Sequence, residues 1–167
     1  ELPGLTVSGE RMSDRASAEQ LKEACQGAAV TIKKVECKEK SEKPPALYDL
    51  TTLQRDANRL LGFTAQQTLD YLQSLYEKKL CTYPRTDSRY LTGDMADSLP
   101  VLVNLVANAM PFRKGIAITC DPQTVINDKK VTDHHAVIPT RNLKDADLSA
   151  LPAGEKAVLE LVALRLL

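Results

Sequence analysis

Apolar residues recur at helical spacing in two neighbouring stretches of the chain, with polar residues between them. The first stretch follows a threonine, Thr51 or Thr52, which we take as its capping residue, and it ends at Gly62. Its apolar positions are Leu53, Ala57, Leu60 and Leu61. A side-chain cap before such a stripe and a glycine after it are typical of an amphipathic helix.

The second stretch begins after a short turn that contains Gly62. Thr64 and Gln67 form a capping-box pattern at its start. Its apolar positions are Leu69, Leu72, Leu75 and Tyr76. Two helices joined by so tight a turn have the outline of a helix-turn-helix, a shape that many proteins use without touching DNA.

Two further segments carry helix signals. Ser17 and Gln20 form a capping-box pattern, which predicts a short helix that stops at Gly27. The apolar spacing over Thr92–Ala109 predicts a longer helix, capped by its first threonine and bent in its first half by Pro100.

Residues 28–40 have the pattern of a β-strand. Val30 and Ile32 lie on one face, and β-branched residues dominate the start of the segment. The residues that follow, up to Pro44 and Pro45, alternate in charge sign and are typical of a solvated linker. One strand beside several helices predicts an α+β fold that is mainly helical.

The C-terminal segment, 155–167, predicts a helix with apolar residues nearly all round its axis, which is the pattern of a buried element. No capping residue or glycine closes it, and the chain begins with Glu1 rather than methionine. We therefore expect a piece cut from a larger protein. The truncated helix should bury its apolar face against the core or, by self-association, against a second copy of the chain.

The composition is that of one globular domain. The chain has 167 residues, 43% of them apolar and 26% charged, and its 22 lysines and arginines equal its 22 acidic residues. A neutral chain binds nucleic acid only through a local patch. The four cysteines show no C-x-x-C spacing, and no apolar run is long enough to span a membrane. We expect a cytoplasmic protein with reduced thiols and no membrane partner.

The densest group of reactive side chains is the string T-Y-P-R-T-D-S-R around Tyr83. A tyrosine becomes a nucleophile where cations or a base favour its phenolate, and Arg85 points to the same side of an extended chain. Its guanidinium suits a phosphodiester, and Asp87 would orient it. The hydroxyls of Thr86 and Ser88 would bond a sugar-phosphate backbone. A packing tyrosine beside a polar turn is the more common arrangement for such residues.

The two histidines of the chain, His134 and His135, are adjacent. Adjacent side chains diverge and seldom bind one ion, so we expect no metal site here. One histidine near a phosphate would act as a proton donor or a charge partner. A buried, hydrogen-bonded structural histidine is the alternative.

Several separate motifs, in order, resemble type IA DNA topoisomerases, and their details are most similar to the bacterial topoisomerase III branch. The matching strings are P-A-L-Y-D-L-T-T-L-Q, A-N-R, L-Y-E, T-Y-P-R-T-D-S-R-Y-L and V-T-D-H-H-A-V-I-P-T. They cover 44–140, and L-P with G-E at 151–155 extends the resemblance toward the C-terminus.

The resemblance implies a role for each matching residue. Tyr83 corresponds to the tyrosine that attacks single-stranded DNA and stays attached to the 5′-phosphate. Arg85 corresponds to the arginine on the scissile phosphate, and His134 to the first histidine of the H-x-A-[IV]-x-P-T motif. The remaining positions, which support the site or contact DNA, are Thr82, Asp87, Ser88, Arg89, Gln73 and Glu77.

The resemblance also implies how the chain is divided. Residues 1–43 would be a hinge-side gate segment with a helix and a strand. Residues 44–143 would be the helix-turn-helix-like catalytic-tyrosine domain, and 144–167 the truncated start of the next helical segment.

In the family, a Toprim domain binds Mg2+ through a D-x-D-x-D cluster, which this sequence lacks. We therefore expect Mg2+ only in the full-length enzyme, no cofactor in this chain, and no activity from this chain alone. The implied partners are single-stranded DNA and the rest of the polypeptide, at the bacterial nucleoid. The reaction would cleave one strand, pass another and religate without ATP.

Two other functions fit parts of the sequence. A helix-turn-helix module without chemistry would dock DNA with the 66–79 helix, and an interaction domain would use the apolar C-terminal helix. The first would pack Tyr83 in the core. The topoisomerase assignment needs Tyr83 at the surface, beside Arg85 and His134.

Overall fold

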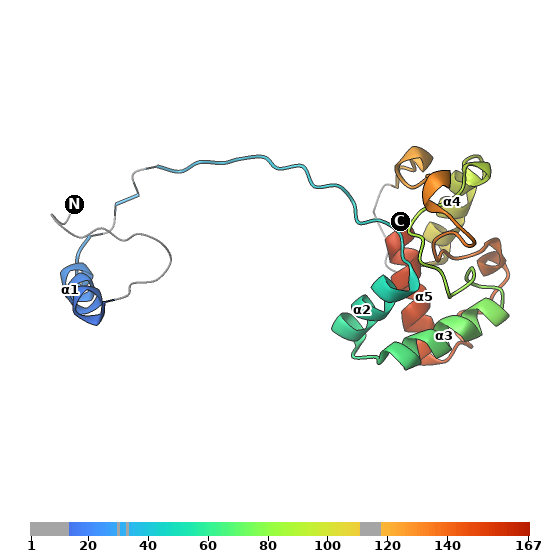
Figure 1. The fold of residues 1–167 in the computed structure, drawn as a ribbon, viewed down its shortest axis with the longest axis horizontal. Helices are drawn as coiled ribbons and strands as arrows, with labels where there is room; N and C mark the ends of the chain where they lie inside the picture. The colour runs from blue at the N-terminus through green and yellow to red at the C-terminus, as the bar shows by residue number, and fades with distance from the viewer. Residues whose placement is uncertain (1–13, 30, 33, 111–117) are drawn as a thin grey trace. The chain divides into compact units, whose positions relative to one another are not determined.

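The computed structural model describes residues 14–29, 31–32, 34–110 and 118–167. The chain divides into two compact units, residues 1–42 and 43–167. Helix α1 belongs to the first unit, whereas α2, α3, α4 and α5 belong to the second, which carries the candidate site (Figure 1).

Helix α1 (Arg15–Cys25) has no buried residue and begins three residues earlier than predicted. The prediction that Ser17 caps it was wrong, because Asp14 is the cap. The Asp14 carboxylate accepts hydrogen bonds from the backbone N–H groups of Ala16 and Ser17 at 3.3 and 2.8 Å. An aspartate just upstream satisfies the free N–H groups of the first turn, so the helix starts after it. Gly27, at φ 77°, follows the end of the helix.

The predicted strand over 28–40 does not form among the described residues of that segment, so this part of the α+β prediction was wrong. Val30 lies outside the described residues. Ile32 and Val35 are 76% and 83% exposed. A strand needs a partner to bond its backbone and a surface to cover its apolar face, and no described residue offers either.

Helices α2 (Leu50–Leu61) and α3 (Ala65–Glu77) form as the apolar spacing predicted. The cap of α2 is Asp49 rather than a threonine, and Thr52 is its capping-box partner. Gly62 ends α2 in the left-handed region, at φ 72°, which favours glycine. The predicted capping box of Thr64 and Gln67 is confirmed at the start of α3.

Helix α4 (Leu99–Ala109) differs from its prediction. Thr92 precedes only a single 3-10 turn, Gly93–Met95, and makes no side-chain cap. Pro100 lies in the first turn of α4, where the missing N–H has no intrahelical partner to lose. The proline therefore starts the helix instead of bending it.

Helix α5 (Ala153–Leu166) is buried against the core, as predicted, and packs on α2, α3 and α4. Gly154 lies so close to the ring of Tyr71 on α3 that any Cβ would collide with it. The buried residues of α5 are Glu155, Val158, Leu159, Val162 and Ala163. The apolar character round this helix is explained by contacts on several sides.

β-structure in the described residues is limited to isolated bridges. Tyr48 pairs with Val137 and Cys81 with Pro139, both antiparallel, and Leu91 pairs with Ile126 in parallel. The fold is therefore mainly helical, and the bridges hold the irregular segments together on the helices. In the part of the chain that the structure describes, no helix has the length and apolarity to cross a membrane.

Candidate active site

Side chains alternate in direction along the segment that follows α3. Pro84, Thr86 and Ser88 are buried, whereas Arg85 and Asp87 between them are exposed. Tyr83 and Thr82 are each half-buried. Period-two alternation is a property of extended backbone, so the segment presents one row of side chains outward and holds itself to the core with the other.

The inward row is made of hydroxyls that bond the segment carrying both histidines. Thr82 Oγ1 donates to the Ala136 carbonyl at 3.2 Å, and Thr86 Oγ1 donates to the His134 carbonyl at 2.8 Å. Ser88 Oγ donates to the Lys130 carbonyl at 2.9 Å. Thr86 and Ser88, predicted to bond a sugar-phosphate backbone, thus use their hydroxyls within the protein.

Tyr83, in the outward row, lies between two rings. Its ring centroid is 4.3 Å from that of His134, with the planes tilted by 40°. The ring of Tyr76, on α3, meets it edge-on at 5.4 Å. Tyr76 is itself 39% exposed, so this cluster lies at the surface rather than in the core.

Two open cavities meet at His134. The larger, of about 450 Å³, is lined by side chains that include Arg85, Asp87 and His134, and by the first turn of α2. The smaller, of about 220 Å³, is lined by Tyr83, His134 and His135. His134, together with Thr132 and Asp133, therefore lines both the cavity next to Arg85 and the cavity next to Tyr83.

Arg85 and Asp87 make no hydrogen bond or ion pair with any described residue, so Asp87 does not hold Arg85 in place here. A guanidinium without a described partner, beside an open cavity, is free to bind an anion.

Gln73 and Glu77, both on α3, form a hydrogen bond with each other, in which Gln73 Nε2 donates to Glu77 Oε1 at 2.9 Å.

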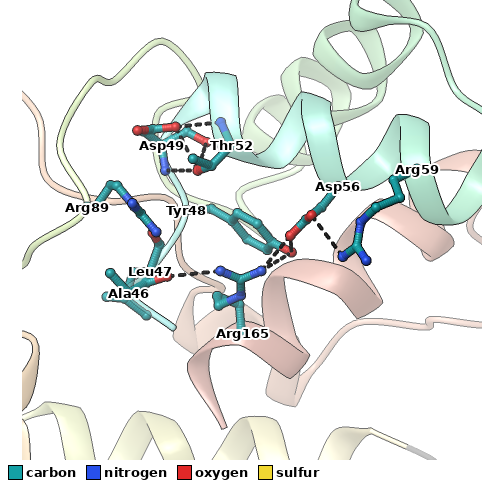
Figure 2. Close-up of polar contacts among 9 residues, drawn as sticks. All are labelled: Ala46, Leu47, Tyr48, Asp49, Thr52, Asp56, Arg59, Arg89 and Arg165. Carbon is teal, nitrogen blue, oxygen red and sulfur yellow. Dashed lines mark hydrogen bonds and ion pairs between the residues drawn. The ribbon is translucent and has the colours of Figure 1, made fainter. Parts of the chain in front are cut away.

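Two other basic residues are already engaged. Arg89 Nε donates to the Leu47 carbonyl at 3.2 Å (Figure 2). Lys78 Nζ lies 2.5 Å from Glu155 on α5, and that carboxylate also accepts from Ser74. These contacts fasten the site segments and α3 to their neighbours.

One network was missed by reasoning from the sequence. Arg165 of α5 lies over the ring of Tyr48, with its guanidinium carbon 4.0 Å from the ring centroid, and donates to the Tyr48 hydroxyl at 2.8 Å and to Asp56 of α2 at 2.5 Å (Figure 2). Arg165 also donates to the Ala46 carbonyl at 3.1 Å. The residues are far apart in sequence, and no local pattern marks them as partners.

Titration properties follow from that network. Burial, together with the hydrogen bond to Asp56, raises the pKa of Tyr48 to about 12. Burial pushes the pKa of Asp56 upward, but hydrogen bonds from Tyr48 and Arg59 and the charge of Arg165 outweigh it, so the net pKa lies below the usual value. The network thus contains a neutral phenol, a carboxylate and a guanidinium.

The described residues offer no cluster of three or more acidic, cysteine or histidine side chains that could hold a metal ion. His135 Nδ1 lies 2.8 Å from the Ala136 carbonyl, which engages one of its two ring nitrogens. These donors do not fit Mg2+, which prefers several carboxylate and water oxygens around it.

Comparisons with known proteins agree on one kind of relative. A family model described as DNA topoisomerase matches residues 4–167. A protein named DNA topoisomerase 3 from Shouchella clausii is 42% identical over 95% of this chain and 22% of its own length. Proteins of the same name are 41% identical over 82% of the chain in Bacillus cereus, and 39% identical over 96% in Bacillus licheniformis.

The matched region is a small part of each relative. It makes up 22%, 19% and 23% of the length of these three proteins. The chain thus spans about a fifth of the curated relatives it matches.

Proposed function

This chain belongs to the DNA topoisomerase family, where it is a type IA, topoisomerase III-like member, and from that premise we propose that it supplies the nucleophile of a strand-passing enzyme. Tyr83 attacks a phosphodiester of single-stranded DNA. The observation that carries the proposal is the contact of the Tyr83 ring with His134, which lines one cavity with Arg85, a residue that has no partner among the described residues.

In the proposed step, a bond forms between Tyr83 Oη and phosphorus while the P–O3′ bond breaks. The electron pair of the broken bond leaves with the 3′ oxygen, which takes up a proton, and the phenol gives up its own proton. The 5′ end stays attached to Tyr83 as a phosphotyrosyl ester. Because one phosphoester replaces another, the reverse attack by the 3′ hydroxyl reseals the strand without ATP.

Arg85 would bind the scissile phosphate. A guanidinium holds two phosphate oxygens at once and stabilises the charge that grows on them during displacement. His134 lines the cavity next to each of the two side chains, so it can serve as the charge partner or proton donor of the same phosphate. Asp87, Gln73 and Glu77 would border the bound strand.

Strand passage, the Toprim domain and its Mg2+ belong to the full-length enzyme in this proposal. The described residues do not fit that ion, and no step above uses it. Single-stranded DNA would be the substrate, in the bacterial cytoplasm at the nucleoid. Self-association through α5 has little support, because Leu164 is the one large apolar residue of this helix that is strongly exposed.

The rival proposal, a docking helix without chemistry, is less well supported by α3. Its polar side chains are largely engaged, with Gln66 bonded to Asp70 and Gln73 to Glu77, while Lys78 pairs with Glu155 on α5. A helix that reads DNA needs such groups free for bases and phosphates.

The deciding experiment is to trap the covalent intermediate. The full-length enzyme is incubated with single-stranded DNA and Mg2+, denatured and digested, and the DNA-bearing peptide is identified by mass spectrometry. An adduct on Tyr83 supports the proposal, whereas an adduct on another residue, or no adduct from an enzyme that still relaxes DNA, would refute it.

A further inference from the structure

Thr86 joins three segments of the site through its own backbone and side chain. Its carbonyl accepts the N–H of Leu50 at the start of α2, at 3.1 Å. Its hydroxyl donates to the His134 carbonyl at 2.8 Å and accepts the N–H of Ser88 at 3.1 Å. Its side chain is buried, so water does not compete for these bonds.

His134 depends on this bond for its position. Among the described residues, Thr86 is the only one that forms a hydrogen bond with His134. His134 itself is exposed. Its ring contacts that of Tyr83, with the centroids 4.3 Å apart. The bond from Thr86 therefore fixes the backbone from which the imidazole reaches Tyr83.

We propose that Thr86 is the positioning residue that holds His134 against Tyr83. It touches neither phosphate nor nucleophile, and it acts through the His134 backbone. Its catalytic consequence rests on the function proposed above for Tyr83. The geometric claim does not, because it concerns the place of one imidazole in the free protein.

The residue type fits this role. The β-branched side chain of threonine has a restricted χ1, which keeps the hydroxyl pointed at one acceptor. Valine has nearly the same shape without the hydroxyl, so Thr86→Val leaves both the His134 carbonyl and the Ser88 N–H without their partner. Serine keeps the hydroxyl, so Thr86→Ser retains the anchor.

The test is an NMR measurement on the 167-residue chain, which has only two histidines. The ring protons of His134 are assigned with a His135→Asn variant, and a Tyr83→Leu variant shows how far the Tyr83 ring current displaces them. We expect Thr86→Val, and Thr86→Ala as a second variant in case valine impairs folding, to lose most of that displacement. Thr86→Ser should keep it.

Ser88→Ala is the matched control. It removes a buried hydroxyl from the same row but leaves the bond between Thr86 and His134 in place. His134 signals that move equally in Ser88→Ala, or that stay unchanged in both Thr86→Val and Thr86→Ala, would overturn the proposal.

The full-length enzyme gives the catalytic readout. Misplacing a catalytic group by about 1 Å can lower a rate on the order of 10²-fold, and we expect a cleavage loss of that size in Thr86→Val with unchanged DNA affinity. Thr86→Ser should restore cleavage to within a few-fold. A wild-type enzyme that forms no adduct on Tyr83 would refute the proposed function while leaving the NMR result to stand.

Discussion

The ring of Tyr83 and the imidazole of His134 are in contact, with centroids 4.3 Å apart, although one follows α3 and the other lies far along the chain. The contact stands at a surface where two cavities meet, and Arg85 borders the larger of them. These reactive side chains line open cavities, and the Arg85 guanidinium has no partner among the described residues. Such an arrangement is more typical of a ligand-binding site than of side chains that only pack.

The nucleophile can be tested by removing one oxygen. Tyr83→Phe in the full-length enzyme should abolish covalent adduct formation, because the ring contacts with Tyr76 and His134 survive but the attacking atom is gone. DNA binding, measured by fluorescence anisotropy, should change little. Tyr76→Phe removes a neighbouring phenol oxygen and should still cleave. Adducts from Tyr83→Phe would end the assignment.

Arg85→Lys should be far more damaging than a conservative change. Lysine keeps the charge but loses the planar two-pronged grip on phosphate, and loss of such a contact typically lowers a rate by about 10²-fold or more. Single-turnover cleavage measures the effect. Arg141→Lys, at another exposed arginine, is the control and should cleave normally. Equal rates for the two variants would show that Arg85 is only a surface residue.

Features set by neighbouring residues could be predicted from the sequence. The capping box of Thr64 and Gln67 and the end of α2 at Gly62 depend only on interactions within a few residues of the chain. The 28–40 strand failed because a strand depends on a partner elsewhere, and none is present in the described residues. Likewise, the outward direction of Tyr83 and Arg85 follows from alternation, whereas the contact of Tyr83 with His134 is made by the fold.

The network around Asp56 should contribute to stability through Arg165. Arg165→Met removes the charged donor that bonds both the half-buried Asp56 carboxylate and the Tyr48 hydroxyl. Its loss should lower the free energy of unfolding by about 2–3 kcal/mol. Arg59→Met is matched, because Arg59 pairs with the same carboxylate from a side chain that is 69% exposed. It should cost under about 1 kcal/mol. The free energies of unfolding are measured in urea. Equal losses in Arg165→Met and Arg59→Met would contradict the larger contribution that we assign to Arg165 of α5.

Tyr48 should make the stability of the chain fall at high pH. Its pKa is about 12 in the folded protein, whereas an exposed tyrosine has a pKa near ~10. Above the lower value the unfolded chain releases the phenolic proton and the folded chain retains it. The stabilisation is therefore complete below about pH 10 and is lost as the pH rises toward 12. Denaturant unfolding at several pH values across this range measures the free energy of unfolding. This free energy should fall less steeply with pH in Tyr48→Phe than in the wild type, and an equal slope would show that Tyr48 is not the cause.

The 167-residue chain itself should fold but should not cleave DNA. Folding is expected because α2, α3, α4 and α5 share one core. Inactivity is expected because phosphoryl transfer relies on positioned cations, and the described residues present no cluster of acidic ligands for one. Single-stranded DNA should still bind weakly, chiefly through Arg85 and Lys79, since Lys78 and Arg89 already have partners, and this binding should fade as salt rises. The chain is incubated with Mg2+ and labelled single-stranded DNA, denatured, and run beside its Tyr83→Phe variant. A covalent band present only with Tyr83 would mean that the residues outside this chain are dispensable for cleavage.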